Sequence, residues 1–129
     1  MILLDTCAIL WWVFNPSELS KKASLHIRKM ESSFGYVSSI SIWEIGIKVK
    51  KKKIEIPISI DELTSRLKRS RVIKIIPVDE TIWINSIQLN WKNQDPADRV
   101  IVATASQLAV PIVTSDKEMR NAFKKNTIW

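Results

Sequence analysis

The fold is indicated most directly by residues 95–116, which read DPADRVIVATASQLAVPIVTSD. The opening Asp-Pro pair supplies a favourable N-cap and a favourable first helical residue, and an apolar pattern continues the predicted helix to about Ala109. A proline then ends the helix, and the β-branched residues 112–114 predict a short strand. Asp116 lies just beyond that strand, so the stretch predicts a helix, a loop and a strand that ends near a carboxylate.

The start of the chain has the same arrangement. The continuously apolar residues 2–4 predict a buried strand, typical of a sheet that is covered on both faces, and Asp5 follows it directly. In open parallel sheets, ligands bind outside the carboxyl ends of the strands, where the strand order reverses. We therefore expect Asp5 and Asp116 to lie at the same edge of one sheet.

Strands and helices alternate along the rest of the chain. This alternation predicts an α/β fold, with a parallel sheet, right-handed crossovers and helices on both faces, in a single domain that spans residues 1–129. No repeat, linker or low-complexity tract interrupts the pattern. The other expected elements are helices at 7–14, from 17 or 20 to 31, from 38, 39 or 41 to 49, and at 59–70, 79–89 and 117–123. The expected strands lie within 34–38, centred on 36–37, and at 72–76 and 127–129.

The composition disfavours several classes of protein. Apolar residues make up 46% of the 129 residues, but no apolar run approaches the roughly 20 residues of a membrane helix, and no signal peptide pattern precedes the first strand. One cysteine excludes an internal disulfide and fits a cytoplasmic protein, and one histidine disfavours zinc, so any metal would be held by oxygen. Only two glycines are present, and the absence of a phosphate-cradling loop disfavours P-loop and dinucleotide enzymes.

Positive charge is concentrated in one part of the chain. The net charge is +7, and residues 48–74, with ten Lys or Arg and three acids, account for all of the excess. A basic strip beside an acidic centre suits a polyanion, such as nucleic acid, whose backbone is gripped while a metal is bound nearby.

Four separate segments could bring acids to the same place. Asp98 lies in the first turn of the helix that Asp95 caps, and Glu44 lies early in the helix that leaves the second strand, so both could join Asp5 and Asp116. Crowded carboxylates repel one another unless a cation is present, and oxygen ligands without His or Cys select Mg²⁺ or Mn²⁺. Such an ion allows water to attack a phosphodiester, so the pattern predicts metal-dependent hydrolysis of nucleic acid.

Each acid also has a structural interpretation. Asp5 and Asp116 could be helix caps, and Asp98 could simply oppose the helix dipole. Glu44 lies three residues after a serine, which is the spacing of a capping box. Asp95 fits an N-cap better than a ligand, and only the joint pattern favours a shared site over these separate roles.

Four sequence blocks resemble the signature blocks of PIN-domain ribonucleases, and most of all the VapC-like toxins of prokaryotic toxin–antitoxin pairs. The blocks are LLDT at 3–6, SIWEIGIK at 41–48, DPADRVIVATA at 95–105 and VTSD at 113–116. The resemblance spans the chain in order. It implies a PIN-like three-layer sandwich with a five-stranded parallel sheet, an endoribonuclease that depends on Mg²⁺ or Mn²⁺, frequent homodimers, and a cognate antitoxin that blocks the site.

Supporting residues can be assigned in the same way. The resemblance places Thr6 and Ser115 on polar positions beside the acids and Asp95 on a frequent extra acid. Arg99 could orient Asp98 or bind substrate, and a surface salt bridge is an equal alternative. Cys7 stands where many relatives carry His or Asn, and it is expected to be a small buried residue. The resemblance also places four residues on the acidic positions of the family. These acids would hold the metal and form the catalytic centre, and they are Asp5, Glu44, Asp98 and Asp116.

The combined hypothesis is a cytoplasmic endoribonuclease toxin that binds RNA and an antitoxin and has no membrane segment. In this hypothesis three aspartates hold the metal, and Glu44 completes the site or positions the attacking water. The tryptophan-rich helices at 7–14 and 42–49 would supply apolar surface for a homodimer or the antitoxin. The residues expected to grip RNA are Lys48, Lys50, Lys51, Lys52, Lys53, Arg66 and Arg69.

Two alternatives remain open at this stage. The first is an α/β phosphatase or phospho-receiver, which would need two acids close together after the first strand, whereas Asp5 is followed by Thr6 and Cys7. The second is a non-catalytic RNA-binding or partner-binding domain that keeps the acids for structure. The discriminating test is Asp5→Asn with Asp98→Asn: full retention of Mg²⁺-dependent RNA cleavage would reject the acidic site. RNA binding without cleavage in the wild type would favour the binding domain, and a positive phosphoryl-transfer assay would favour the phosphatase.

Overall fold

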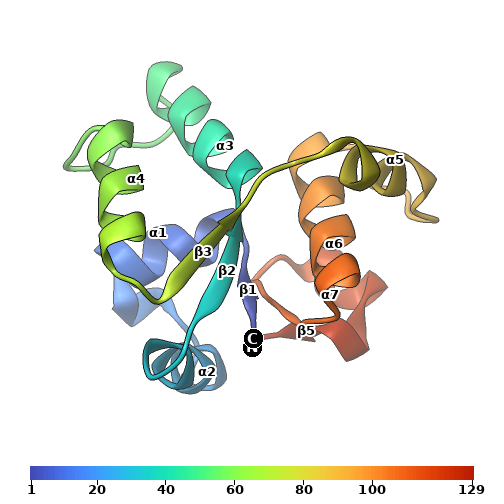
Figure 1. The fold of residues 1–129 in the computed structure, drawn as a ribbon, viewed down its shortest axis with the longest axis horizontal. Helices are drawn as coiled ribbons and strands as arrows, with labels where there is room; N and C mark the ends of the chain where they lie inside the picture. The colour runs from blue at the N-terminus through green and yellow to red at the C-terminus, as the bar shows by residue number, and fades with distance from the viewer.

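Five parallel strands form one sheet in the computed structural model, which describes all 129 residues (Figure 1). The strands lie in the order β3-β2-β1-β4-β5, and every neighbouring pair is parallel. The predicted five-stranded parallel sheet is therefore confirmed. The strands are β1 (Leu3–Leu4), β2 (Gly35–Ser38), β3 (Ile73–Ile76), β4 (Ile112–Val113) and β5 (Thr127–Ile128).

Each α-helix begins after a serine or aspartate whose side chain accepts a hydrogen bond from a backbone N–H group of the first turn. These caps satisfy donors that have no partner inside the helix, which explains why the polar residues marked helix starts in the sequence. The helices are α1 (Thr6–Phe14), α2 (Lys21–Glu31), α3 (Ser39–Lys50), α4 (Ile60–Arg69), α5 (Glu80–Gln88), α6 (Pro96–Leu108) and α7 (Lys117–Ala122), with 3-10 turns η1 (Pro16–Glu18) and η2 (Lys124–Asn126).

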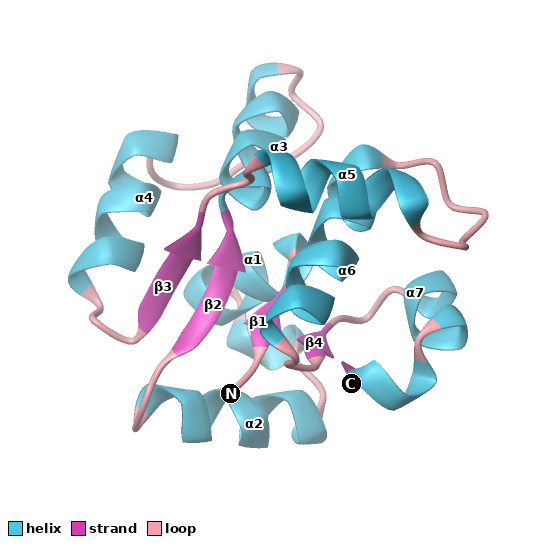
Figure 2. Cartoon of the chain, turned by 45° about the vertical axis from the view of Figure 1, so that its right-hand side comes forward, coloured by secondary structure: helices cyan, strands magenta, loops and turns pink.

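The side chains of the sheet alternate between two hydrophobic cores. Leu4 and Val113 pack in the core that α1, α2 and α4 complete, whereas Leu3 and Ile112 pack in the core that α5, α6 and α7 complete. This division follows from the pleat of a strand, which points successive side chains to opposite faces. Helices therefore cover both faces of the sheet, and the three-layer architecture is confirmed (Figure 2).

The strand order reverses at β1. The chain first builds outward from β1 through β2 to β3, and it then returns to place β4 on the other side of β1. Leu4 of β1 pairs with Val113 of β4, so the segments that follow these two residues leave the same edge of the sheet. This edge carries Asp5 and Asp116, as predicted from the two strand ends.

One prediction about burial was wrong. Cys7 is exposed, not buried, because it lies in the first turn of α1 on the side that faces away from the core. None of the helices is both long and apolar enough to cross a membrane.

Candidate active site

Asp5 lies directly after β1, at the strand reversal. Only 7% of the residue is exposed, and its Oδ1 accepts a hydrogen bond of 2.8 Å from the backbone N–H of Ala8. Asp5 is therefore the N-cap of α1. The cap uses one carboxylate oxygen and leaves the other for a different partner, so a structural role and a ligand role are compatible in this residue.

Thr114 connects Asp5 to Asp116. The threonine is fully buried just after β4, and its Oγ1 accepts a hydrogen bond of 3.0 Å from the backbone N–H of Asp116. The same side chain is a hydrogen-bond partner of the Asp5 carboxylate. Thr114 was not identified from the sequence as a site residue, although it lies inside the VTSD block.

Asp116 has a cap role like that of Asp5. It is the N-cap of α7, and its Oδ1 accepts a hydrogen bond of 2.7 Å from the backbone N–H of Met119. Ser115, which was expected to support the site, is half-buried and makes no side-chain hydrogen bond within the chain. The buried hydroxyl beside the two aspartates is thus supplied by Thr114.

Asp98 lies in the first turn of α6. Its Oδ2 accepts a hydrogen bond of 2.9 Å from Nδ2 of Asn93, and its backbone N–H donates to Oδ1 of Asp95 at 3.0 Å. Asp95 is exposed and is the N-cap of the helix, as its structural interpretation predicted. Asn93 is a second residue that the sequence did not single out.

Glu44 lies on α3, beyond its first turn. The helix begins after Ser38, so the capping-box interpretation of Glu44 is wrong. The carboxylate is 3.7 Å from Nζ of Lys48, and 15% of the Glu44 side chain is exposed. The start of α3 is fastened to the start of α1 by a buried hydrogen bond of 3.0 Å, from Oγ1 of Thr6 to Oγ of Ser41. This bond gives Thr6 a supporting role, because it joins the helices that follow Asp5 and carry Glu44.

Negative charges act on one another across these segments. Burial raises the pKa of Asp5 from its ordinary 3.8 to about 6, and the charges of Asp98 and Asp116 add to that effect. Burial likewise raises the pKa of Asp98 to about 6, with further contributions from Asp95, Asp116 and Glu44. The structure therefore brings the four predicted acids within electrostatic reach of one another, and none of the three aspartates forms a salt bridge.

The acids do not form a preformed chelate. No three Asp, Glu, His or Cys side chains lie close enough together to enclose a metal ion directly. The donor set nevertheless fits Mg²⁺ or Mn²⁺ in kind, because it consists of carboxylates alone and Mg²⁺ is usually held by one or two carboxylates and several waters. Burial, with a smaller contribution from the neighbouring negative charges, raises the pKa values of Asp5 and Asp98, and a divalent cation would stabilise both carboxylates in their charged form.

Cys7 is exposed beside the acids but is not a nucleophile. Partial desolvation raises the pKa of its thiol to about 11, and the negative charges of Asp5, Glu44 and Asp98 add to this, whereas Lys48 opposes it. A thiol with such a pKa is almost entirely protonated at neutral pH. Chemistry at this edge therefore rests on the carboxylates.

Arg99 organises the loop before α6. Its guanidinium donates to five backbone carbonyls in the last turn of α5 and the loop that follows it, at 2.8–3.3 Å, and it forms no salt bridge with Asp98. The supporting role predicted for Arg99 is consequently structural: it shapes the loop that carries Asn93. The acceptors are Ser86, Ile87, Leu89, Trp91 and Asn93.

The predicted RNA-gripping residues fall into two groups. Lys48 and Lys50–Lys53 lie along the second half of α3 and just beyond it, on the side of the sheet edge that carries the acids (Figure 1). Arg66 and Arg69 lie near the end of α4, which leads into the start of β3 and thus to the opposite edge. Both arginines also donate to Glu62, at 3.3 and 3.0 Å. Lys48, at 3.7 Å from Glu44, is the member of the two groups that the structure places beside an acid of the site.

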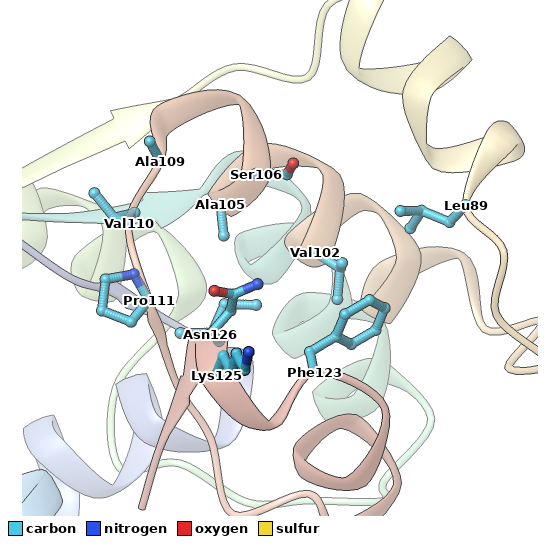
Figure 3. A pocket seen from close by; sticks show the side chains of 11 residues that line it. Leu89, Val102, Ala105, Ser106, Ala109, Val110, Pro111, Phe123, Lys125 and Asn126 are labelled. Carbon is cyan, nitrogen blue, oxygen red and sulfur yellow. The ribbon is translucent and has the colours of Figure 1, made fainter.

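None of the four main cavities is lined by any of the four acids. The largest, of about 470 Å³, lies between the second half of α6 and the segment around Phe123 and Asn126, and no acid lines it (Figure 3). A groove of about 460 Å³ lies nearer the site, between Trp43 of α3 and Trp83 of α5, with Pro96 at its side. Both indoles are exposed, by 59% and 44%, so the structure has an uncovered apolar face beside the acidic edge.

Comparisons with known proteins agree with this architecture. A family model described as PIN domain matches residues 2–125. Ribonuclease VapC22 from Mycobacterium tuberculosis (strain ATCC 25618 / H37Rv) is 26% identical over 131 residues, which cover 99% of this chain and 98% of that protein. The crystal structure of FitAcB from Neisseria gonorrhoeae has a TM-score of 0.67 at 24% identity and covers 98% of this chain and 96% of its own.

A toxin–antitoxin complex from Klebsiella pneumoniae is similar to the same degree. It has a TM-score of 0.65 at 20% identity and covers 100% of this chain and 97% of its own. At these identities the two solved structures show a shared fold, and the resemblance noted in the sequence is thereby confirmed at the level of architecture.

Proposed function

This chain belongs to the PIN domain family, and we propose that it is a metal-dependent endoribonuclease that serves as the toxin of a toxin–antitoxin pair. The similarity to a ribonuclease over nearly the whole length of both chains supports the reaction, and the similarity to a toxin–antitoxin complex supports the biological role. The observation that carries the proposal is the meeting of acids from four segments near the strand reversal: the charges of Asp98 and Asp116 act on Asp5, and those of Asp116 and Glu44 act on Asp98.

The residues that would hold Mg²⁺ or Mn²⁺, one or two of them directly and the rest through metal-bound waters, are Asp5, Asp98 and Asp116. When bound, the ion would supply water activation and neutralisation of the phosphate's charge. Asp5 and Asp116 are held by their helix caps and by Thr114, so each is oriented before a cation arrives. Glu44, paired with a lysine at 3.7 Å, would accept a proton from the attacking water.

RNA would approach across the end of α3. The lysines from 48 to 53 supply positive charge on the side that carries the acids, and this charge would bind phosphates upstream or downstream of the bond that is cut. Arg66 and Arg69 would contribute less, because Glu62 already pairs with both and α4 ends at the opposite edge. Whether the target is tRNA, rRNA or mRNA is decided by contacts outside this acidic centre.

Two protein partners are part of the proposal. A cognate antitoxin would block the acidic edge. A second copy of the chain would cover the apolar face formed by Trp43, Trp83, Ile84 and Ile87, which are exposed by 59%, 44%, 52% and 76%. Two copies with a charge of +7 repel each other, so a face with few charges is where they could pack.

The reaction is tested by incubating the purified protein with total RNA and Mn²⁺ or Mg²⁺ and mapping new 5′ ends. We expect cleavage that EDTA abolishes and that Asp98→Asn reduces by at least about 100-fold, because one carboxylate ligand is lost. The matched control is Asp61→Asn on α4, an exposed acid outside the site, which should cleave like the wild type.

Three results would reject this function. Full activity in Asp98→Asn would remove the acidic centre from the reaction. RNA binding without cleavage in any metal would favour the non-catalytic binding domain. Release of inorganic phosphate from a phosphomonoester, with intact RNA, would favour the phosphatase.

A further inference from the structure

We infer that Asn93 is a positioning residue that sets the orientation of the Asp98 carboxylate for a divalent cation. The inference rests on the proposed function. In it, Asn93 acts through the Asp98 carboxylate and not by contact with the substrate. It follows from three observations about the loop between α5 and α6: the contacts of Asn93, the clamp formed by Arg99, and the free oxygen of Asp98.

Asn93 makes two side-chain hydrogen bonds that differ in purpose. Its Oδ1 accepts from the backbone N–H of Asp95 at 2.8 Å, which is a local turn between residues two apart. Its Nδ2 donates to Oδ2 of Asp98 at 2.9 Å, and this bond lowers the pKa of Asp98 against the stronger effect of burial. The first bond shapes the loop, and the second acts on the acid.

The loop is built to hold Asn93 in place. Nη1 of Arg99 donates to the backbone carbonyl of Asn93 at 2.8 Å and to that of Trp91 at 2.9 Å, and the rest of the guanidinium is bound to carbonyls at the end of α5. These bonds from one side chain tie a segment without regular secondary structure, which contains Trp91 and Asn93, to the end of α5. Arg99 adjoins Asp98 in the sequence, so one turn of α6 carries both the acid and the clamp.

Only one oxygen of the Asp98 carboxylate is consequently hydrogen-bonded. Oδ2 is held by Asn93, while Oδ1 forms no hydrogen bond within the chain. A carboxylate bound at one oxygen has a defined rotation about its χ2 angle, and the free oxygen then points in a constant direction. Partners of this kind around metal ligands typically change metal affinity by about 10- to 100-fold when they are removed.

The experiment compares Asn93→Ser with Asn93→Ala in Mn²⁺ binding, measured by calorimetry or electron paramagnetic resonance on the purified protein. Serine can keep the turn to the Asp95 N–H, but it is too short to reach Asp98, so it removes only the positioning bond. We expect both variants to bind Mn²⁺ at least about tenfold more weakly than the wild type. Gln94→Ala, which removes an exposed amide one residue away, is the matched control and should bind normally.

Cleavage kinetics supply a second readout. If Asn93 positions the acid, kcat falls in Asn93→Ser while KM for RNA stays within about twofold, because the lysines that bind the phosphates are unchanged. A purely structural role would instead appear as a lower melting temperature, which is measured on the same samples and is expected to stay near the wild-type value in Asn93→Ser.

The outcomes separate the two proposals. Wild-type Mn²⁺ affinity in Asn93→Ser overturns the positioning role, even if the protein cleaves RNA. Absence of Mn²⁺ binding by the wild type overturns it as well. Weakened Mn²⁺ binding in Asn93→Ser, in a protein that cleaves no RNA, supports the positioning role and rejects the ribonuclease.

Discussion

Asp5 has a buried charge that the folded protein must accommodate. Its pKa is raised from 3.8 to about 6, so between about pH 4 and pH 6 the folded state holds a proton that the unfolded state has lost. Stability therefore falls as pH rises through this window, and above it the full cost is present, on the order of 3 kcal/mol for a shift of this size. Such an acid is kept because it serves another purpose, and metal binding is the purpose proposed here.

The consequence can be measured with Asp5→Asn, because asparagine retains the helix cap. In EDTA at pH 7.5 this variant should be more stable to urea than the wild type by up to about 3 kcal/mol, and the difference should vanish near pH 4. Saturating Mn²⁺ should stabilise only the wild type. If the free energies of unfolding of the two proteins, measured in urea, changed with pH in the same way, the raised pKa of Asp5 would be contradicted.

Thr114 is uncharged, and its side chain forms hydrogen bonds with the Asp5 carboxylate and with the backbone N–H of Asp116. Thr114→Val keeps the shape and removes the hydroxyl, which leaves the backbone N–H of Asp116 without its acceptor inside the protein. We expect a loss of about 1–3 kcal/mol in the free energy of unfolding and a lower kcat for RNA cleavage. Thr114→Ser restores the hydroxyl and should recover most of the activity. Equal activity in the valine and serine variants would show that the hydroxyl is dispensable.

At the scale of elements, the sequence predicted the strands and helices well because their signals are local. Asp95 and the proline after it mark the start of α6, and apolar runs mark the strands. Thr114 and Asn93 were missed because their importance depends on which strand or loop lies next to them, and no local pattern contains that information. Cys7 was misjudged for a related reason: its burial depends on the face of α1 that meets the sheet.

The end of α3 gives an element-scale test of RNA binding. Replacing Lys50, Lys51 and Lys53 with glutamine removes three charges at the end of α3 and leaves Lys52, whose φ of 57° makes it a sensitive turn position. We expect weaker RNA binding and a slope of log affinity against log salt that is smaller by about 2, since each phosphate contact to a single strand contributes about 0.7.

The double variant Arg66→Gln with Arg69→Gln is the comparison for that test. It removes nearly as much charge from α4, but from residues that Glu62 already neutralises in part, at the far edge of the sheet. Its salt dependence should stay close to that of the wild type. An equal or larger loss of RNA binding in this variant would place the RNA path along α4 and away from α3.

At the scale of the whole molecule, charge and apolar surface are separated. The lysines that carry much of the +7 charge lie at the end of α3 and beyond, whereas α5 exposes Trp83, Ile84 and Ile87 with few charges around them. This face is where we propose that a second copy packs, and that copy would bring its own acids close to the first set. The antitoxin and RNA would then meet a paired surface.

Ile87→Glu tests this arrangement, since Ile87 is 76% exposed and its replacement should not disturb the fold of one chain. We expect the wild type to sediment as a dimer at micromolar concentration and Ile87→Glu to sediment as a monomer, because a buried unpaired carboxylate opposes association. Leu25→Glu on α2, at a position 52% exposed, introduces the same charge on another face and should remain dimeric. A monomeric wild type would leave the apolar face of α5 without a second copy to cover it. A dimer that survives Ile87→Glu and is lost in Leu25→Glu would place the interface away from α5.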